Sequence, residues 1–157
     1  MKIVLLTIGK TNEKYLIKGI SNFTKRLSKY CNFTIVEIPN LRRVNNLSIN
    51  ERKAMEGDLI LNRINNNDHL FLLDNKGKSF SSIGFSNILQ NQMLLSRKSI
   101  IFVIGGAYGF SDKMYNRADQ LISLSKMTLS HQMVRLIFVE QLYRAYTILL
   151  NHPYHNE

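Results

Sequence analysis

The pattern of apolar and polar positions predicts strands that alternate with amphipathic helices. Short runs rich in Ile, Val, Leu and Phe that end at Gly, Pro or Asn are typical of strands buried in a sheet. The expected strands are residues 2–9, 33–38, 69–74, 99–104 and 120–124. Between them, apolar residues recur at spacings of three and four, which indicates one helical face. The expected helices are residues 13–29, 48–64, 81 or 82 to 95, 111–118 and 131–151.

Local signals support several of these boundaries. Ser48 is followed three positions later by Glu51, the spacing of a capping box at a helix start. The sequence Lys-Gly-Lys at 76–78 predicts a basic turn after the third strand. The last helix is apolar around nearly its whole circumference, so we expect it to be buried on more than one side and to form a subunit interface. Alternating strands and helices predict one α/β domain over residues 1–157, with a mainly parallel sheet flanked by helices.

Composition indicates which class of binding partner and which cellular compartment to expect. The net charge is +10 and the pI is about 9.9, with the excess of Lys and Arg concentrated in residues 1–63. Such a balance favours a polyanionic partner such as RNA, although a basic surface that only confers solubility is an equal alternative. Cys31 is the single cysteine and cannot form an internal disulfide. With no export signal and no apolar run of about 18 residues, we expect a cytoplasmic protein.

The run IIFVIGGAYGF at 100–110 is the strongest candidate for chemistry. A buried strand ends there in Gly105, Gly106 and Gly109, and ligands bind at the carboxyl ends of strands in α/β sheets. No Gly-Lys-Ser/Thr follows, which excludes a Walker phosphate loop, and the spacing G-G-x-x-G is not the dinucleotide motif G-x-G-x-x-G. A tight turn is the alternative for this segment taken alone.

Other catalytic classes have little support. The four histidines lack the spacing of metal ligands, apart from His152 and His155 on a tail that contains Pro153, so we expect no metal. Cys31 has no neighbouring base in the sequence, which argues against a thiol nucleophile. The nucleophile elbow G-x-S-x-G of serine hydrolases is absent.

Three segments together carry a resemblance to a known family. They are FVIGGAYGF at 102–110, ISLSKMTLSHQMVRLIFVEQLYRAY at 122–146 and NHPYH at 151–155. With the first strand and the chain length, they resemble the ribosomal RNA large subunit methyltransferase H family of the SPOUT class across nearly the whole chain. The resemblance implies an α/β fold with a C-terminal trefoil knot and S-adenosylmethionine as methyl donor. It also implies methylation of N3 of a pseudouridine in 23S rRNA by a homodimer.

The resemblance assigns roles to particular residues. The donor contacts that it implies are Leu73, Gly105, Leu124, Ser125, Lys126, Met127, Thr128 and Leu129. It makes Tyr154 and His155 of the tail the candidate catalytic residues, with His131 and Arg135 as weaker ones. The basic residues expected to contact RNA phosphates, or else to form a solvated basic face, are Lys25, Arg26, Lys29, Arg42 and Arg43.

Two departures and two alternatives accompany this interpretation. Asn156 and Glu157 stand where similar sequences carry a basic residue after the tail histidine, so one RNA phosphate contact is in doubt. Ser130 stands where family members often have proline, which changes the stiffness of that loop. The alternative functions are a catalytically silent RNA-binding or ribosome-assembly factor on the same fold, and a knotted enzyme that methylates transfer RNA.

Overall fold

The computed structural model describes residues 1–42 and 44–155, so the predicted RNA contact Arg43 lies outside the described residues. All ten predicted elements are present, with boundaries shifted by a few residues. The strands are β1 (Lys2–Ile8), β2 (Asn32–Ile38), β3 (His69–Ser79), β4 (Ser99–Ile104) and β5 (Gln120–Ser123). The helices are α1 (Lys14–Leu27), α2 (Ile49–Leu61), α3 (Ser82–Leu94), α4 (Asp112–Arg117) and α5 (Met133–Leu149).

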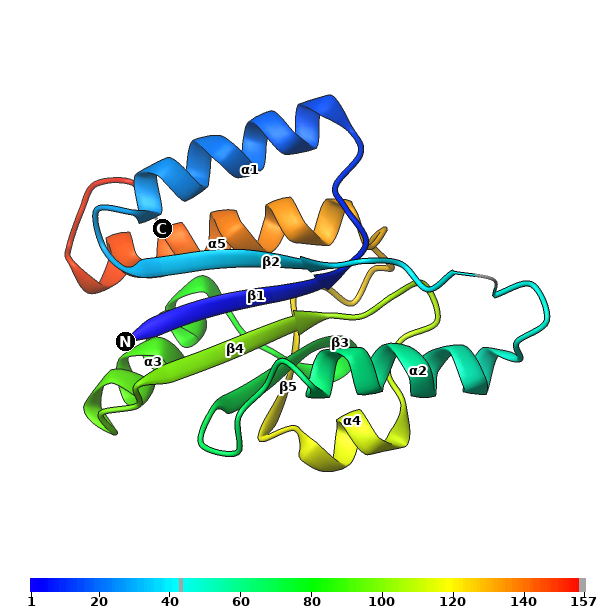
Figure 1. Ribbon diagram of the computed structural model, residues 1–157. Coiled ribbons are helices and arrows are strands. Elements are labelled where there is room, and N and C mark those ends of the chain that lie inside the picture. Colours follow the sequence, from blue (N-terminus) through cyan, green and yellow to red (C-terminus); the bar gives the residue numbers. More distant parts are fainter. Residues whose placement is uncertain (43, 156–157) are drawn as a thin grey trace.

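The five strands form one parallel sheet in the order β2-β1-β4-β3-β5. Helices cover both faces, with α1, α3 and α5 on one side and α2 and α4 on the other (Figure 1). The predicted α/β class is therefore confirmed. Each connecting helix runs back along the sheet, so its first residues lie near the carboxyl ends of the strands and its last residues near their amino ends.

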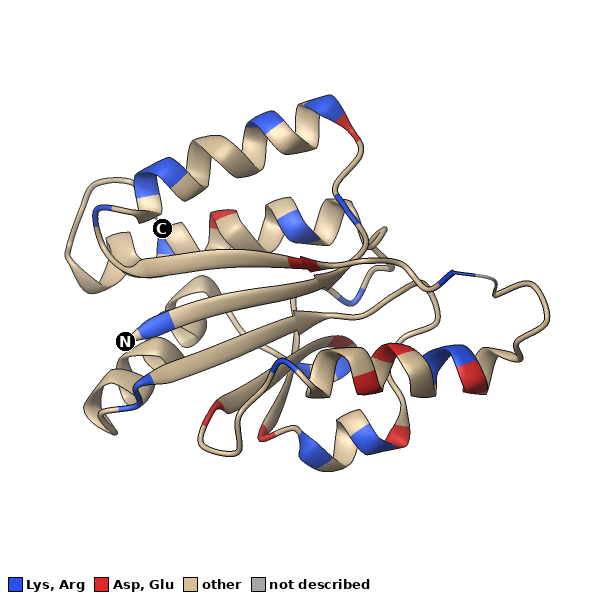
Figure 2. Ribbon diagram, viewed as in Figure 1, with Lys and Arg blue, Asp and Glu red and all other residues tan. Residues whose placement is uncertain are grey.

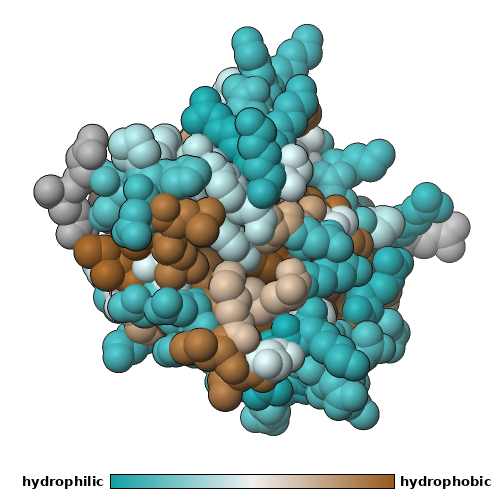
Figure 3. Space-filling model, turned by 90° about the vertical axis from the view of Figure 1, so that its left-hand side faces the viewer, coloured by the Kyte–Doolittle hydropathy of each residue, from teal (hydrophilic) through white to brown (hydrophobic). Residues whose placement is uncertain are grey.

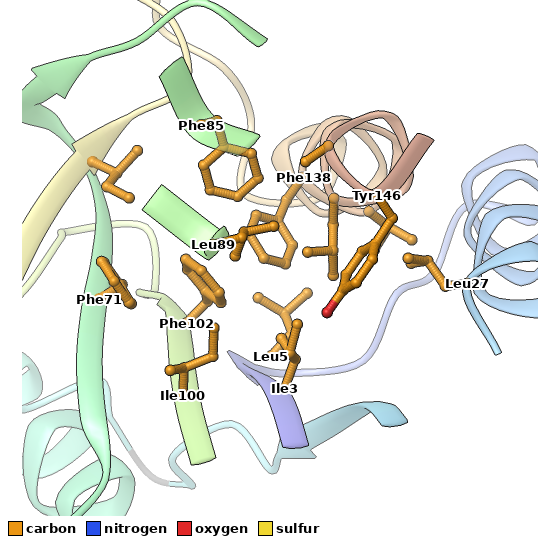
Figure 4. Packing of buried hydrophobic residues seen from close by; sticks show 14 of the residues in the cluster. Ile3, Leu5, Leu27, Phe71, Phe85, Leu89, Ile100, Phe102, Phe138 and Tyr146 are labelled. Atoms are coloured by element: carbon orange, nitrogen blue, oxygen red, sulfur yellow. The ribbon is translucent and has the colours of Figure 1, made fainter. Parts of the chain in front are cut away.

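Strand side chains alternate between the two faces and build two cores. In β1, Ile3 and Leu5 point to the side of α1, α3 and α5, whereas Val4 and Leu6 point to the side of α2 and α4. On the first side the rings of Phe71 and Phe102 stack with centroids 4.8 Å apart, and Phe138 of α5 lies equally close to Phe102 (Figure 4). This aromatic contact fixes α5 against the centre of the sheet.

Contacts within the chain bury much of the apolar circumference of helix α5. It lies on the sheet between α1 and α3, and Phe138, Val139, Leu142 and Ala145 are fully buried there (Figure 1). Burial on more than one side is therefore confirmed. The subunit interface stays a prediction, because packing inside one chain already uses most of the apolar surface of α5.

The Lys-Gly-Lys segment is not the predicted turn. Strand β3 continues through it to Ser79, and the register against β5 shifts between Leu73 and Lys78, which both pair with Ile122. The intervening residues form a bulge. A Cβ atom on Gly77 would lie 2.6 Å from the backbone nitrogen of Ile122. Glycine is present here because two backbones approach closely. A glycine in such a bulge and a glycine in a turn look alike in the local sequence.

The face formed by the amino ends of the strands exposes a group of apolar side chains (Figure 3). Leu94 and Leu95 end α3, and Leu150 follows α5; all three are at least half exposed. Within residues 1–42 and 44–155, no helix has both the length and the hydropathy needed to cross a bilayer.

We predict that Gly77→Ala destabilises the protein. Because the added methyl group meets backbone atoms, which cannot rotate away as a side chain can, we expect a loss of roughly 1–3 kcal/mol in the free energy of unfolding. Urea denaturation followed by circular dichroism measures this loss.

Gly84→Ala is the matched control, because its nearest neighbours, Phe80 and Ser81, lie at an ordinary 3.4 Å. Its stability should be unchanged or slightly higher, since alanine favours a helix more than glycine does. Equal stability of the two variants would show that the contact between β3 and β5 is looser than described.

Candidate functional site

A cavity of about 350 Å³ opens at the carboxyl ends of β4 and β5, beside residues 73–75 of β3. This volume lies in the range of small-ligand sites. Its walls come from three segments: the β3 bulge, the glycine loop after β4, and the chain from β5 into α5. The lining residues are Leu73, Asp74, Asn75, Ile104, Gly105, Gly106, Ala107, Gly109, Phe110, Ser123, Leu124, Ser125, Met127, Thr128, Leu129, Ser130, His131 and Val134.

The predicted donor contacts meet in this cavity, with one exception. The residues that line it are Leu73, Gly105, Leu124, Ser125, Met127, Thr128 and Leu129. Lys126 is exposed and is absent from the walls. Sequence reasoning missed Asp74, Asn75 and Ser123, although the position of Asp74 at the end of an apolar run was a signal that could have revealed it.

The segment after β5 is stabilised by its own hydroxyl groups. The Ser123 hydroxyl donates to the carbonyl oxygen of Ser125 at 2.8 Å. The Ser125 hydroxyl in turn accepts a bond from the Met127 backbone N–H at 2.9 Å. These two local bonds between side chains and backbone stabilise the conformation of residues 123–127 beside the cavity.

A side chain is disfavoured at each of the three glycines of the loop after β4, for a different physical reason at each position. A Cβ on Gly105 would press on the ring of Phe110, and one on Gly106 would collide with the carboxylate of Glu56. Gly109 adopts φ +78°, a conformation that side-chain-bearing residues rarely take. A larger residue at any of the three positions would therefore disturb the cavity wall.

Helix α2 supports the outer side of the glycine loop. The Arg52 guanidinium lies over the ring of Tyr108 and donates to the carbonyl oxygen of Val44 at 2.7 Å. Burial against the loop raises the pKa of Glu56, and nearby Arg52 opposes this rise. This support was not evident from sequence, because α2 and the loop are about fifty positions apart.

The lining is apolar and hydroxyl-rich, with few ionisable groups. Asp74 and His131 are the titratable side chains among the described lining residues. No group of three His, Cys, Asp or Glu that could hold a metal ion occurs in residues 1–42 and 44–155. Such walls suit an organic ligand recognised by apolar contact and backbone hydrogen bonds.

Arg135, predicted as a weaker catalytic candidate, does not line the cavity. Its side chain is 2% exposed, and its guanidinium donates to the carbonyl oxygens of Ile8 at 2.7 Å and Gly9 at 3.0 Å. It also donates to the Thr11 hydroxyl and the His131 carbonyl oxygen. Burial lowers its pKa, and Glu37 opposes this. These contacts support a structural role, in which Arg135 joins the start of α5 to the end of β1.

His131 is the one catalytic candidate that reaches the cavity. It lies just before α5 and is exposed. Its neighbour Gln132 donates to the Lys10 carbonyl oxygen at 2.9 Å and accepts from the Asn12 N–H at 3.0 Å. The loop after β1 therefore fixes the backbone that carries His131, and the imidazole Nε2 lies 3.5 Å from Gln132 Nε2.

The tail residues Tyr154 and His155 lie along α5 and away from the cavity walls. The Tyr154 hydroxyl donates to Glu140 at 3.1 Å, and the Arg144 guanidinium lies over the Tyr154 ring. The pKa of Tyr154 is raised by burial and by the Glu140 carboxylate. His155 Nδ1 lies 3.4 Å from Arg144. The structure thus brings the two tail candidates together with each other and separates them from His131.

The predicted RNA contacts divide into two places. Lys25, Arg26 and Lys29 are exposed at the end of α1. Basic residues gather at this end of α1, which lies near the amino ends of the strands (Figure 2). The cavity lies at the opposite, carboxyl end of the sheet. Arg26 lies over the rings of Phe23 and Tyr143, next to the tail. Arg42 follows β2 and so lies near the carboxyl ends of the strands.

We predict that Arg135→Met lowers the free energy of unfolding by roughly 2–4 kcal/mol, because buried carbonyl oxygens lose their donors. Arg144→Met on the same helix should cost under about 1 kcal/mol, because it removes a partly exposed ion pair. Urea denaturation of both variants tests this. A variant at Arg135 with wild-type stability but no methyl transfer would support the catalytic role instead.

Comparison with known proteins gives a consistent result. The chain is 52% identical over 157 residues to a protein of Flavobacterium johnsoniae named ribosomal RNA large subunit methyltransferase H, with both chains covered completely. Proteins of the same name from Christiangramia forsetii and Parabacteroides distasonis are 53% and 50% identical, covering at least 99% of each chain. The predicted SPOUT methyltransferase family matches residues 1–155. The chain therefore belongs to the SPOUT methyltransferase family.

Proposed function

We propose that this protein transfers a methyl group from S-adenosylmethionine to N3 of a pseudouridine in 23S rRNA, acting in the cytoplasm as a homodimer. The observation that carries the proposal is the convergence of Leu73, Gly105 and the 124–129 segment on one cavity. Relatives about 50% identical over their full length carry the name ribosomal RNA large subunit methyltransferase H, which supports rRNA as the substrate.

The cavity fits the donor chemically. Leu73, Leu124 and Leu129 provide apolar surface for an adenine ring, and Gly105 allows close approach of the ring to the backbone. Hydroxyl groups of Ser125 and Thr128 are available to polar edges and sugar hydroxyls. When bound, the donor supplies an activated methyl group on a sulfonium centre.

The chain's own contribution to the reaction is alignment and proton removal. In-line displacement at a methyl group requires the acceptor nitrogen to be held opposite the leaving sulfur, with water excluded. The N3 position carries a proton that must leave, and a nearby base accelerates that step. His131 is the candidate base on the cavity wall, while Tyr154 and His155 are candidates only if the tail reaches a cavity.

The position of the tail favours a homodimer with a shared site. Tyr154 and His155 are held on α5 by Glu140 and Arg144, outside the cavity of their own chain. Arg26 lies in the same region, so a tail candidate and a predicted RNA contact share one surface. We propose that α5 and the tail of one subunit complete the cavity of the other.

The trefoil knot also remains part of the proposal. A knotted chain must pass backbone against backbone at close range, which strains residues with side chains. The support for the knot is that residues 1–155 match the predicted SPOUT methyltransferase family.

The activity is tested with tritiated S-adenosylmethionine and three acceptors: ribosomes, free 23S rRNA and bulk tRNA, all from cells that lack this methylation. We expect label in 23S rRNA, and nuclease digestion followed by mass spectrometry should find it on a pseudouridine base. Saturable donor binding without transfer to any acceptor would indicate the silent RNA-binding factor. Label in tRNA alone would indicate the tRNA enzyme.

A second prediction concerns the shared site. His155→Ala removes a tail candidate, and Thr128→Arg fills the cavity from an exposed position. Each variant alone should be inactive. Mixed after partial denaturation and refolding, they should regain activity, because each heterodimer keeps one intact cavity and one intact tail on different chains. If each variant folds and binds its partner but mixing restores nothing, the shared site is wrong.

A further inference from the structure

Asp74 is a charged residue of the cavity wall that the proposed reaction does not yet use. It belongs to the β3 bulge, where the register against β5 shifts between Leu73 and Lys78. Bulges often turn a side chain toward a functional site. Among the described lining residues, Asp74 is the only one with a carboxylate side chain.

Two hydrogen bonds hold the Asp74 carboxylate in place. Oδ1 accepts from the Lys76 backbone N–H at 2.8 Å, and Oδ2 accepts from the Tyr115 hydroxyl at 2.6 Å. Burial, together with Asp74 itself, raises the pKa of Tyr115, so its hydroxyl stays protonated and remains a donor. Each carboxylate oxygen has capacity for at least one further hydrogen bond.

The charge of this carboxylate matters because of the ligand's chemistry. The protein carries a net charge of +10, which opposes binding of any cation. S-adenosylmethionine has a positive sulfonium centre in addition to its zwitterionic amino acid. After methyl transfer the product has a neutral thioether at the same atom, and the two molecules are otherwise alike. A fixed anion in the wall therefore distinguishes them by charge alone.

We infer that Asp74 is a specificity-determining residue that favours the sulfonium donor over the neutral thioether product. This inference rests on the proposed function. Tyr115 acts as a positioning residue, because it touches the carboxylate and does not line the cavity. The consequence is weaker product retention, since the attraction to Asp74 is lost when the methyl group leaves.

The experiment is isothermal titration of wild type and Asp74→Asn with S-adenosylmethionine, S-adenosylhomocysteine and sinefungin, an analogue with a cationic amine in place of the sulfonium group. We expect Asp74→Asn to weaken donor affinity about tenfold, as for a unit charge lost a few ångströms away in a partly polar site. Sinefungin should lose affinity to a similar extent. The product should change less than about twofold on the same reasoning.

Two further variants separate the effect of the Asp74 charge from the effect of a charge lost elsewhere and from the effect of the Tyr115 hydrogen bond. Asp112→Asn removes the same charge from the exposed start of α4, outside the cavity wall, and should leave all three affinities unchanged. Tyr115→Phe keeps the Asp74 charge and should preserve the preference for the donor over the product, with a smaller loss of donor affinity. Thermal unfolding confirms that each variant is folded before titration.

The outcomes are distinct. Equal weakening of donor and product by Asp74→Asn would overturn the inference and place Asp74 on a group that both molecules share, such as a ribose hydroxyl. Unchanged affinities would overturn it as well. A wild-type protein that binds neither donor nor product would overturn the proposed function itself, and this result is separate from both.

Discussion

The functional end of the molecule depends on the close passage of β3 and β5. Gly77 lies against the backbone of Ile122 with no room for a methyl group. This contact lies within the register shift between Leu73 and Lys78, in the bulge that carries Asp74. It also fixes the end of β5, from which the 123–130 segment departs over the cavity. Because Gly77 has no side chain, the β3 bulge and the segment after β5, two of the three cavity walls, can lie this close together.

Arg135 connects the start of α5 to the end of β1. A guanidinium buried to this degree is stable only when its donors are satisfied, and here backbone carbonyl oxygens from the end of β1 supply the acceptors. The start of α5 is thereby joined to the centre of the sheet, and Ser130, His131 and Val134 become part of the wall. Arg135 also donates to the carbonyl oxygen of His131, so it fixes the backbone that carries a catalytic candidate on the cavity wall.

The sequence predicted the fold because apolar periodicity is a local property, and the Ser48 capping box is present at the expected helix start. The set of candidate donor contacts followed from a resemblance across the whole chain, and seven of these eight residues line one cavity. Lys76, Gly77 and Lys78 were interpreted wrongly because a glycine between two polar residues is also typical of a turn, and its true neighbour, Ile122, lies far along the chain. Burial of Arg135 was likewise not evident from the sequence, since three of its hydrogen-bond partners, Ile8, Gly9 and Thr11, lie more than a hundred positions away.

The separation of tail and cavity has a mechanistic consequence. Tyr154 and His155 could reach their own cavity only by leaving Glu140 and Arg144, and this would expose the half-buried pair to water for no gain in packing. In the proposed homodimer that loss would be avoided, because the tail would stay on α5 while the α5 surface docks beside the cavity of the other subunit. On this arrangement the bonds that hold the tail away from its own cavity are also the bonds that present it to the partner. The basic residue Arg26 beside it would then bring RNA to a site formed by both chains.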